Sequence, residues 1–368
     1  MLGKIVHEFI PCAGNSRNSE GAFIEKKNGN ILFVYSRFSS EAEDNAFAEL
    51  WAVESSDGGR NFSGMHPVLT REAEQTYNIM SVSLLRMKNG NIGLFYLIRM
   101  GEEEMYCYLR RSSDEGEHFG ERILCTPEKP AFFIVNNDRV IRLRSGRILI
   151  PAALHRRTHP AGENAVYRLD PFSQVMFYYS DDDGYTFHMS DTRLTVQNTL
   201  SLNGLQEPGV LEIGNNVVWC FIRTGMGFYY ESYSHDGGNH WTQAERSCFT
   251  GPESPLCAKR LSDGRIFVVW NPVPLYNGRS DVVQGVWTGR RTPLVCAFSE
   301  GEPRVFSAPL VIENAPDAGY CYTAIHPLRD AVLLAYCSGG IKEGSCLNKM
   351  TIRLIHNDEF KNAEAYVG

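Results

Sequence analysis

The chain has 368 residues and a formal net charge of −7, so it lacks the basic excess that a nucleic-acid-binding face requires. Hydrophobic residues make up 43% of the sequence, including 20 Phe and 17 Tyr, which is enough for a large core. No run of apolar residues is long enough for a transmembrane helix, so we expect no membrane span.

The N-terminal residues, Met-Leu-Gly-Lys-Ile-Val-His-Glu, lack the long apolar core of a signal peptide. The 10 cysteines are scattered and form no CxxC metal knuckle, which favours reduced, buried thiols in a cytoplasmic protein. His155 and His159 lie close together in sequence, but no carboxylate–His spacing supports a metal site. We therefore expect no metal and no cofactor.

A turn of the form Ser-x-Asp-x-Gly-x-x-aromatic occurs four times. In each copy the Asp can hydrogen-bond the backbone amides that follow it, while the Gly can adopt a positive φ. A motif that recurs at intervals of roughly 55–70 residues indicates a repeat architecture. The copies occupy residues 55–62, 112–119, 180–187 and 234–241.

A second turn alternates with the first, and an apolar run follows it each time. One example is Asp263-Gly264-Arg265 before the run Ile-Phe-Val-Val. Each copy is typical of a β-hairpin that leads into a buried strand. There are six such turns, which predict six units, at residues 28–30, 89–91, 145–147, 214–216, 263–265 and 329–330.

Almost no segment has a helical period, and residues 40–51 come closest. A unit of about sixty residues with four short strands, repeated six times, predicts an all-β, six-bladed β-propeller. Because single blades have no core of their own, we expect one domain over residues 1–368. The alternative is a tandem pair of β-sandwiches.

The repeated turns are Asp boxes, and through them the chain resembles the sialidase (neuraminidase) superfamily of Asp-box, or BNR-repeat, proteins. Asp boxes also occur in other propellers, so they support the fold more than the function. The resemblance implies a tyrosine nucleophile, a glutamate that activates it, an aspartate acid/base and three arginines that bind the substrate carboxylate. A phenol suits this substrate because its carboxylate would repel an anionic nucleophile, but a phenol pKa of about 10 requires an adjacent base.

Three of these roles follow from short motifs. Residues 205–212, Leu-Gln-Glu-Pro-Gly-Val-Leu-Glu, are similar to the family's Asn-Glu-x-x-Val-Val-Glu, which makes Glu207 the expected activating glutamate. Arg223 follows at the family's spacing, where a guanidinium fork would bind the carboxylate. Residues 319–325 are similar to the strand that carries the nucleophile, which indicates Tyr322. Tyr320 would face the same side of a strand and stays an alternative.

Two further positions are matched by their place in the chain. Arg291 precedes the Tyr322 strand where the family has its third arginine, and the adjacent Arg290 is the alternative. Asp44 occupies the place of the acid/base aspartate, in an acidic loop that also contains Glu41 and Glu43.

The chain departs from the family at its first arginine. Residues 15–21 read Asn-Ser-Arg-Asn-Ser-Glu-Gly where the family has Arg-Ile-Pro, so Arg17 is about two residues out of register. Arg37 is the second candidate for this role. Asn78, and Asp138 within the polar stretch 135–139, are expected to line the substrate pocket.

The resemblance thus implies an exo-glycosidase that releases a terminal sialic (nonulosonic) acid with retention, through a covalent intermediate on Tyr322. The expected partner is a sialylated or other acidic glycan. Because the Arg-Ile-Pro motif is missing, a hydrolase or lyase of another acidic sugar is an alternative, and a non-catalytic carbohydrate-binding propeller is another. We expect the four residues Glu207, Arg223, Arg291 and Tyr322 to converge in one depression.

Overall fold

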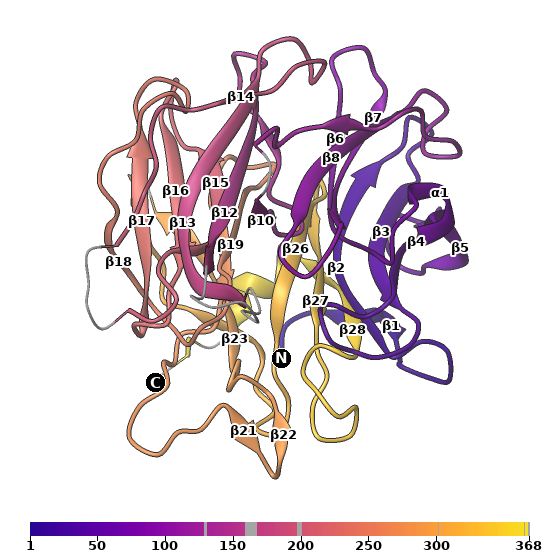
Figure 1. The fold of residues 1–368 in the computed structure, drawn as a ribbon. Coiled ribbons are helices and arrows are strands. Elements are labelled where there is room, and N and C mark those ends of the chain that lie inside the picture. Colours follow the sequence, from indigo (N-terminus) through magenta and orange to yellow (C-terminus); the bar gives the residue numbers. More distant parts are fainter. Residues whose placement is uncertain (129–130, 159–167, 197–200, 301, 364, 367–368) are drawn as a thin grey trace, which may run out of the picture.

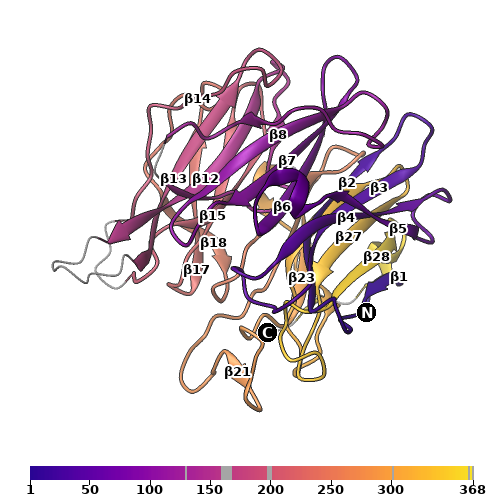
Figure 2. The same ribbon diagram turned by 45° about the vertical axis from the view of Figure 1, so that its right-hand side comes forward.

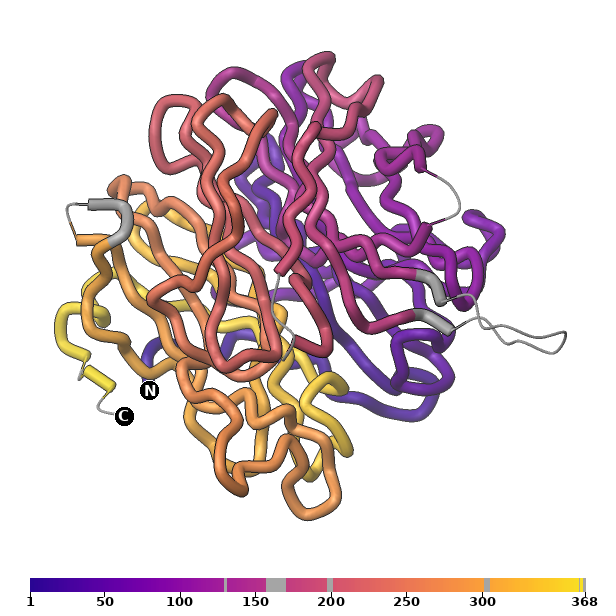
Figure 3. The backbone as a smooth tube through the Cα atoms, turned by 60° about the vertical axis from the view of Figure 1, so that its left-hand side comes forward, coloured from indigo at the N-terminus to yellow at the C-terminus, as the bar shows by residue number. Residues whose placement is uncertain are grey.

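The computed structural model describes residues 1–368 apart from 129–130, 159–167, 197–200, 301, 364 and 367–368. The described residues are almost entirely strand and loop. The helical segments among them are α1 (Arg71–Glu74) and the 3-10 helix η1 (Glu359–Asn362). Figure 3 shows the chain winding around the molecule from its indigo start to its yellow end. Residues 40–51, the segment with the most helical sequence pattern, form a loop and part of a strand.

Antiparallel pairing groups the strands into units, and each unit runs outward from its first strand. The first unit contains β2 (Arg17–Glu25), β3 (Ile31–Phe38), β4 (Ala48–Ser55) and β5 (Ser63–Leu69). The second contains β6 (Asn78–Arg86), β7 (Ile92–Arg99), β8 (Met105–Ser112) and β9 (Ile123–Leu124). The third contains β10 (Phe132–Ile134), β11 (Ile141–Arg142), β12 (Ile148–Thr158), β13 (Arg168–Ser180) and β14 (His188–Met189). Single parallel pairs, Ala48 with Asn78 and Met105 with Phe132, connect these units.

The remaining units follow the same plan. The fourth contains β15 (Gln206–Glu212), β16 (Val218–Arg223), β17 (Phe228–Ser234) and β18 (Glu245–Thr250). The fifth contains β19 (Cys257–Arg260), β20 (Ile266–Trp270), β23 (Leu294–Glu300), β24 (Glu302–Phe306) and β25 (Leu310–Glu313). The short hairpin of β21 (Val282–Val283) and β22 (Val286–Trp287) projects from it at the bottom of Figure 1.

The last unit joins the two ends of the chain. It contains β26 (Cys321–Pro327), β27 (Ala331–Cys337) and β28 (Met350–His356), and its outer strand is the N-terminal β1 (Lys4–Phe9). β1 pairs antiparallel with β28, so indigo lies beside yellow in Figure 2. The pairings thus give six antiparallel units in the described residues, and the chain is an all-β β-propeller.

Both repeated turns lie at the same end of the units. The six hairpin turns connect the first and second strands, and the Asp boxes connect the third and fourth strands. In the first box the Ser55 hydroxyl accepts from the Gly59 amide at 2.9 Å, and Asp57 Oδ1 accepts from the Arg60 and Asn61 amides at 3.0 Å. In the fourth box Trp241 folds back and stacks on Phe177, with ring centroids 3.8 Å apart.

The strand order places the opposite ends of the units around one centre. The first strands of neighbouring units pack together, as β2 does with both β6 and β26, and β19 with both β15 and β26. Since strands alternate in direction, the starts of first strands, the ends of second strands and the starts of third strands share one face. Residues at these positions can therefore meet although they are far apart in sequence.

Apolar side chains fill the space between units. Phe9 from β1, for example, packs on Tyr35 of β3, with ring centroids 4.4 Å apart, and thereby joins the last unit to the first. All 10 cysteines are free, and eight of them are buried. None of the helices described is long and apolar enough to cross a membrane.

Candidate active site

Four of the six first strands carry a shared irregularity near their starts, a residue with positive φ within a β-bulge. In β2 the residue is Glu20 (φ 58°), in β6 Ser81 (59°), in β15 Glu207 (45°) and in β26 Tyr322 (55°). A non-glycine residue in this region costs on the order of 1–3 kcal/mol, and a bulge turns its side chain away from the regular alternation. The bulges thus direct four polar side chains toward the centre of the molecule.

These four side chains line a cavity of about 190 Å³. One part of its wall is polar and carries the carboxylates and the phenol. The other part is apolar and comes mostly from β6, β7, β8 and β10. The lining residues outside the four bulges are Asp44, Met80, Leu97, Arg99, Met105, Phe132, Ile134 and Asn136.

Tyr322 and Glu207 are in direct contact in this cavity. The Tyr322 hydroxyl lies 3.1 Å from Glu207 Oε1, within hydrogen-bond distance. Arg223, at the end of β16, places Nη1 2.5 Å from the same oxygen and 3.5 Å from the Tyr322 hydroxyl. Glu207 Oε2 is buried and has no hydrogen-bond partner. The carboxylate therefore has one oxygen engaged with the phenol and another available.

The pKa values in this contact favour a neutral phenol beside a carboxylate. Burial raises the pKa of Tyr322 well above its usual value, and the Glu207 carboxylate raises it further. The Arg223 and Arg291 guanidinium groups act in the opposite direction. Tyr322 is therefore protonated at rest, and its oxygen needs a base at the moment it attacks.

Arg291 lies behind Tyr322 and is almost fully buried. Its guanidinium carbon is 5.4 Å from the centre of the Tyr322 ring and 4.8 Å from that of the Trp287 ring. Nη2 donates to the Glu253 carbonyl at 3.0 Å, and the Glu253 carboxylate lies 3.3 Å from Arg223 Nη2. Glu253 thus connects two of the predicted arginines.

A second donor group of Arg291 reaches a cysteine cluster. Nη1 donates to Cys321 Sγ at 3.0 Å, and Cys321 packs with the buried Cys337 and Cys346. Burial raises the pKa of the Cys321 thiol, but the neighbouring thiols and Arg291 outweigh burial and hold this pKa well below its usual value. Cys321 Sγ thus supplies a hydrogen-bond acceptor for the buried guanidinium of Arg291.

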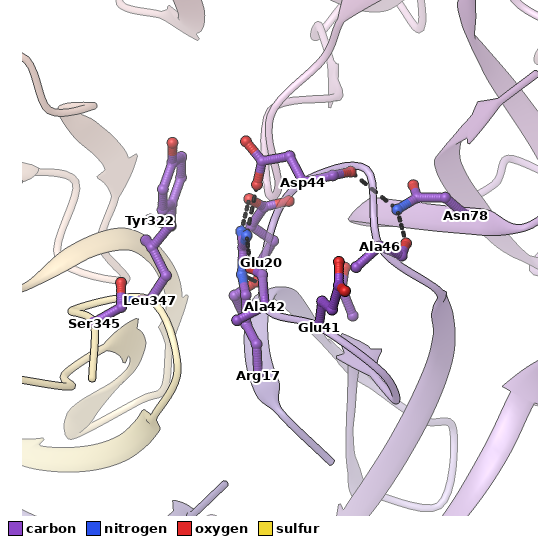
Figure 4. Close-up of polar contacts among 12 residues, drawn as sticks. Arg17, Glu20, Glu41, Ala42, Asp44, Ala46, Asn78, Tyr322, Ser345 and Leu347 are labelled. Carbon is purple, nitrogen blue, oxygen red and sulfur yellow. Dashed lines mark hydrogen bonds and ion pairs between the residues drawn. The ribbon is translucent and has the colours of Figure 1, made fainter. Parts of the chain in front are cut away.

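Across the cavity from Tyr322, Arg17 forms a second charged group (Figure 4). Arg17 Nη1 lies 2.5 Å from Asp44 Oδ1, and Nη2 lies 3.1 Å from Glu20 Oε1. The second oxygen of Glu20 accepts from the Ser81 hydroxyl at 2.6 Å. Asp44 is the exposed member of this group, because 67% of its side chain is accessible, whereas Glu20 is buried.

The carboxyl groups of Asp44 and Glu20 have opposite pKa shifts. Partial loss of hydration beside the cavity opposes ionisation of Asp44, although much of its side chain is accessible, and contact with Arg17 outweighs this effect and lowers the pKa of Asp44. Burial raises the pKa of Glu20 to about 7, although Arg17 opposes the shift. Near neutral pH, Asp44 is therefore ionised at rest, while Glu20 exchanges a proton.

The structure separates the alternatives that the sequence leaves open. Arg17 contacts Glu20 and Asp44, which line the cavity, whereas Arg37 of β3 lies over the Trp51 ring at 4.6 Å and donates to the Gly14 carbonyl. Tyr320 packs beside Tyr336 in a core cluster and does not line the cavity. Arg290 Nε donates to the Ser280 carbonyl at 2.8 Å, away from Tyr322.

Two further predicted pocket residues have structural contacts instead. Asn78 Nδ2 donates to the carbonyls of Asp44 and Ala46, at 3.1 and 2.7 Å, and so holds the loop that carries Asp44. Asp138 has a positive φ and forms an ion pair with Lys259 at 2.7 Å, while its other oxygen accepts from the Ile325 amide. Neither residue lines the cavity, so their predicted direct contacts with substrate gain no support.

Five polar residues of the site lie outside the sequence-based assignment: Glu20, Ser81, Arg99, Glu253 and Cys321. Glu20 and Ser81 depend on bulges, and Glu253 lies in a loop before β19. The sequence does contain a pattern that could have indicated Glu20, because this residue follows Arg17 by three positions and directly precedes Gly21. A β-carbon on Gly21 would come within 2.3 Å of Phe33, so this glycine is required by packing.

No group of three or more metal-ligating side chains occurs in the part of the chain that the structure describes. His155 is buried and its Nδ1 lies 3.2 Å from the Asp170 carbonyl. His159, the other histidine of the candidate metal pair, lies outside the described residues.

Comparison with known families places this geometry. The sequence pattern of the BNR repeat-like domain matches residues 22–334. The chain belongs to this family. The family is part of the sialidase/BNR-repeat superfamily, and the matched residues include the four Asp boxes of this chain. No curated protein matches the sequence.

Solved structures show the same fold at low identity. The Hadza microbial sialidase Hz136 superposes with a TM-score of 0.69 and 15% identity, over 94% of this chain and 66% of that protein. The leech intramolecular trans-sialidase complexed with 2,7-anhydro-Neu5Ac gives 0.72 and 13%, over 98% and 71%. A Dyadobacter fermentans protein of unknown function gives 0.70 and 20%, over 96% and 99%. At these identities the likeness establishes the fold alone.

Proposed function

We propose that the protein is a retaining exo-glycosidase of the sialidase type, which releases a terminal sialic or related nonulosonic acid from a glycoconjugate. The contact between Tyr322 and Glu207 at 3.1 Å, with Arg223 on the same carboxylate oxygen, carries the proposal. A tyrosine hydrogen-bonded to a buried glutamate has little structural purpose on a strained bulge, but it is the arrangement that an activated phenol nucleophile requires. The sialidase relatives with the same fold add support.

The substrate carboxylate would bind on the side of Arg223 and Arg291. Each guanidinium has five N–H donors, and both groups keep some without a partner, including the buried Nε of each. Arg17 differs, because Nε, Nη1 and Nη2 all donate to Ser19, Asp44 or Glu20. A carboxylate can therefore contact Arg223 and Arg291 first, and it reaches Arg17 only by displacing an acidic side chain.

In the first chemical step the Tyr322 oxygen attacks the anomeric carbon and its proton passes to Glu207. The glycosidic C–O bond breaks, and its oxygen takes a proton from the carboxylic acid form of Asp44. The sugar is then bound covalently to Tyr322. Since Asp44 is ionised while it contacts Arg17, it must leave Arg17 and take up a proton before this step.

In the second step water attacks the same carbon and gives a proton to the Asp44 carboxylate. The bond to Tyr322 breaks, and the Tyr322 oxygen regains its proton from Glu207. Two inversions at one carbon give net retention. Glu207 thus returns to its starting state.

A second candidate is a hydrolase or lyase of another acidic sugar. The observation that favours it is the occupied Arg17, where Asp44 and Glu20 take the place that a substrate carboxylate would have. The missing Ile-Pro after Arg17 agrees with this view. A propeller that binds an acidic glycan without cleaving it is the remaining candidate.

The test combines turnover with trapping. The 4-methylumbelliferyl α-glycoside of N-acetylneuraminic acid should release its fluorophore, and a 2,3-difluoro sialic acid should leave a covalent adduct on the Tyr322 peptide in mass spectrometry. Tyr322→Phe should lose several orders of magnitude in kcat and form no adduct, because the covalent route is gone. Tyr320→Phe is the matched control and should keep both.

The outcomes distinguish the candidates. Fluorophore release with the adduct on Tyr322 supports the proposal. Binding of a sialic-acid analogue without release of sugar supports the binding propeller. Neither binding nor release supports a different acidic sugar.

A further inference from the structure

Glu20 is a buried carboxyl of the cavity that the proposed mechanism does not use. It occupies the bulge of β2, the counterpart of the Glu207 bulge in β15, and its side chain reaches the cavity lining. We propose that Glu20 is a proton-coupled gate for anionic sugars, so that a substrate carboxylate engages the arginines fully only after Glu20 has taken up one proton. This inference rests on the proposed function and specifies how its substrate is admitted.

The first argument is the hydrogen bonding of Arg17. Nη1 donates to the Ala42 carbonyl and to Asp44, Nε donates to Ser19, and Nη2 donates to Glu20. Of the two acidic partners, Asp44 is on an exposed loop and can move into water. Glu20 is in a strand with its second oxygen held by Ser81, so it cannot withdraw. Only a change in its charge frees the Arg17 donor.

The second argument is the charge balance. Four arginines and three carboxylates line the cavity or contact a residue that lines it, and a fourth carboxylate, that of Glu253, lies 3.3 Å from Arg223 Nη2. With all eight groups ionised the site is neutral and does not attract an anion. One added proton gives the site a net charge of +1. The eight groups are Arg17, Arg99, Arg223 and Arg291, with Glu20, Asp44, Glu207 and Glu253.

The third argument is that Glu20 is the group prepared to take this proton. It faces one cation and several anionic or neutral groups, which come from β2, the Asp44 loop, β6, β15 and β26. Burial raises the pKa of Glu20 to about 7, the Asp44 and Glu207 carboxylates reinforce the shift, and Arg17 and Ser81 oppose it. An added substrate carboxylate would raise this pKa further, because like charges disfavour ionisation. The cation that faces Glu20 is Arg17, and the anionic or neutral groups belong to Asp44, Ser81, Glu207 and Tyr322.

The cavity is also ready for a polar ligand at this place. Asn136 lines it, is 3% exposed, and has an Nδ2 group without a hydrogen-bond partner. Glu207 Oε2 is likewise buried and unpaired. Buried polar atoms without partners are rare in native structures, and a ligand is one common reason for them.

The expected pH dependence follows from the fraction of protein with protonated Glu20. If only this fraction admits the anion, the apparent Kd equals the intrinsic Kd divided by the fraction. A pKa of about 7 then makes binding about tenfold weaker at pH 8 than at pH 6. Sialic acids stay ionised throughout this range, so the ligand itself contributes no such dependence.

The experiment measures binding rather than turnover. Isothermal titration calorimetry with 2-deoxy-2,3-dehydro-N-acetylneuraminic acid, between pH 5.5 and 8.5, gives Kd, and two buffers with different ionisation enthalpies give the proton uptake. The wild type should take up close to one proton per site at pH 8 and should show the tenfold change in Kd. Glu20→Gln keeps the shape without the charge, so it should bind equally at pH 6 and 8 and take up no proton.

Glu41→Gln is the matched control. Glu41 is an exposed carboxylate in the loop that carries Asp44, and the Arg17 side chain donates to Ser19, Glu20, Ala42 and Asp44 instead, so this replacement should leave the wild-type pH dependence in place. A wild-type Kd that is the same at pH 6 and pH 8, with no proton uptake, overturns the gate alone. Absence of binding at every pH, in the wild type and in both variants, overturns the proposed function and the gate with it. The wild-type measurement decides the question even if Glu20→Gln does not fold.

Discussion

Glu207 and Glu20 occupy matching bulges, and their neighbours give them different properties. Glu207 contacts the Tyr322 hydroxyl and the Arg223 guanidinium, and in the proposed mechanism it takes up the proton of this hydroxyl. Glu20 contacts Arg17 and the Ser81 hydroxyl, and in the proposed gate its protonation sets the charge of the site. The same backbone device thus places two carboxylates in one cavity, and the partner that each one meets determines its task.

At this scale Asp44 gives a direct test of the acid role. Asp44→Ala should lower kcat/KM on a natural sialoside by about 10²- to 10⁴-fold, the usual contribution of a general acid. The loss should be much smaller on the 4-methylumbelliferyl glycoside, because this leaving group needs little protonation. Steady-state rates on both substrates check the prediction.

The matched control is Glu41→Ala in the same loop. Glu41 is exposed, and its backbone carbonyl accepts a hydrogen bond from the Ser16 hydroxyl. An alanine keeps this carbonyl, so both rates should be nearly unchanged. Equal losses on the two substrates for Asp44→Ala would remove Asp44 from the acid role and leave it a partner of Arg17.

At the scale of elements, the repeated turns were predictable because their chemistry is local. Each Asp box places its Ser, Asp and Gly within a few residues, and the hydrogen bonds close inside the motif, as in Ser55 to Asp57 at 2.8 Å. The six hairpin turns are local as well, for example Gly29, whose amide donates to the Lys26 carbonyl. The β-propeller was therefore readable from the sequence.

The bulges could not be predicted from the sequence, because they involve contacts with neighbouring units. Positive φ at Glu20 or Tyr322 contradicts local preference, and both residues lie in first strands that pack against first strands of other units. Motif similarity indicated Tyr322, Glu207 and Arg223, and the structure brings these three together. It could not indicate Glu20, whose partners Arg17 and Ser81 meet through β2 and β6. It also could not show that Asp138 pairs with Lys259 rather than lining the cavity.

The first Asp box offers a test of how turns join units. Gly58 and Gly59 both have positive φ, 73° and 85°. A β-carbon on Gly59 would lie 2.7 Å from Leu333 of β27, whereas one on Gly58 meets only the flexible Arg60 side chain at 3.4 Å. Gly58→Ala should cost about 1 kcal/mol of unfolding free energy for the backbone alone. Gly59→Ala should cost that amount plus about 1–3 kcal/mol for overpacking.

Urea denaturation of both variants measures the two values. Equal losses would mean that Leu333 moves aside at no cost, and that the contact between this box and β27 does not stabilise the fold. Hydrolysis rates should be unchanged in both, since the boxes and the cavity lie on opposite faces.

At the scale of the molecule, two sets of carboxyl groups shape stability against pH. Hydrogen bonds, first from the Asn61 side chain, lower the pKa of Asp57 to about 2. In the boxes of Asp182 and Asp236, burial opposes ionisation, but the hydrogen bonds outweigh it and lower the pKa of both carboxyl groups to about 2. Their pKa in the unfolded chain is about 3.9, so their contribution to the stability of the fold is complete above pH 4 and is lost as the pH falls toward 2. Glu20 has a raised pKa, so its stabilisation is complete below its unfolded value of about 4.3 and is lost as the pH rises to about 7.

Thermal unfolding between pH 2 and 9 should therefore show a decline on both sides of a maximum near pH 5. Asp57→Asn should make the acid side less steep, and Glu20→Gln should remove part of the decline between pH 4.5 and 7. An upper decline that is the same in Glu20→Gln and in the wild type would contradict the raised pKa of Glu20.

Closure by the N-terminal strand gives the last prediction. β1 completes the last unit through its pairing with β28, Arg353 Nη1 donates to the Leu2 carbonyl at 2.7 Å, and Phe9 packs on Tyr35 of the first unit. Removal of residues 1–10 would expose the edge of β28 and leave Arg353 with fewer partners, so we expect a lower melting temperature and aggregation at the open edge. A synthetic peptide of residues 1–10 should restore the melting temperature by adding the missing strand, while a scrambled peptide should not. If the truncated chain melts at the temperature of the intact chain, β1 covers an edge that is already stable, and the ring is held closed by contacts between the first strands alone.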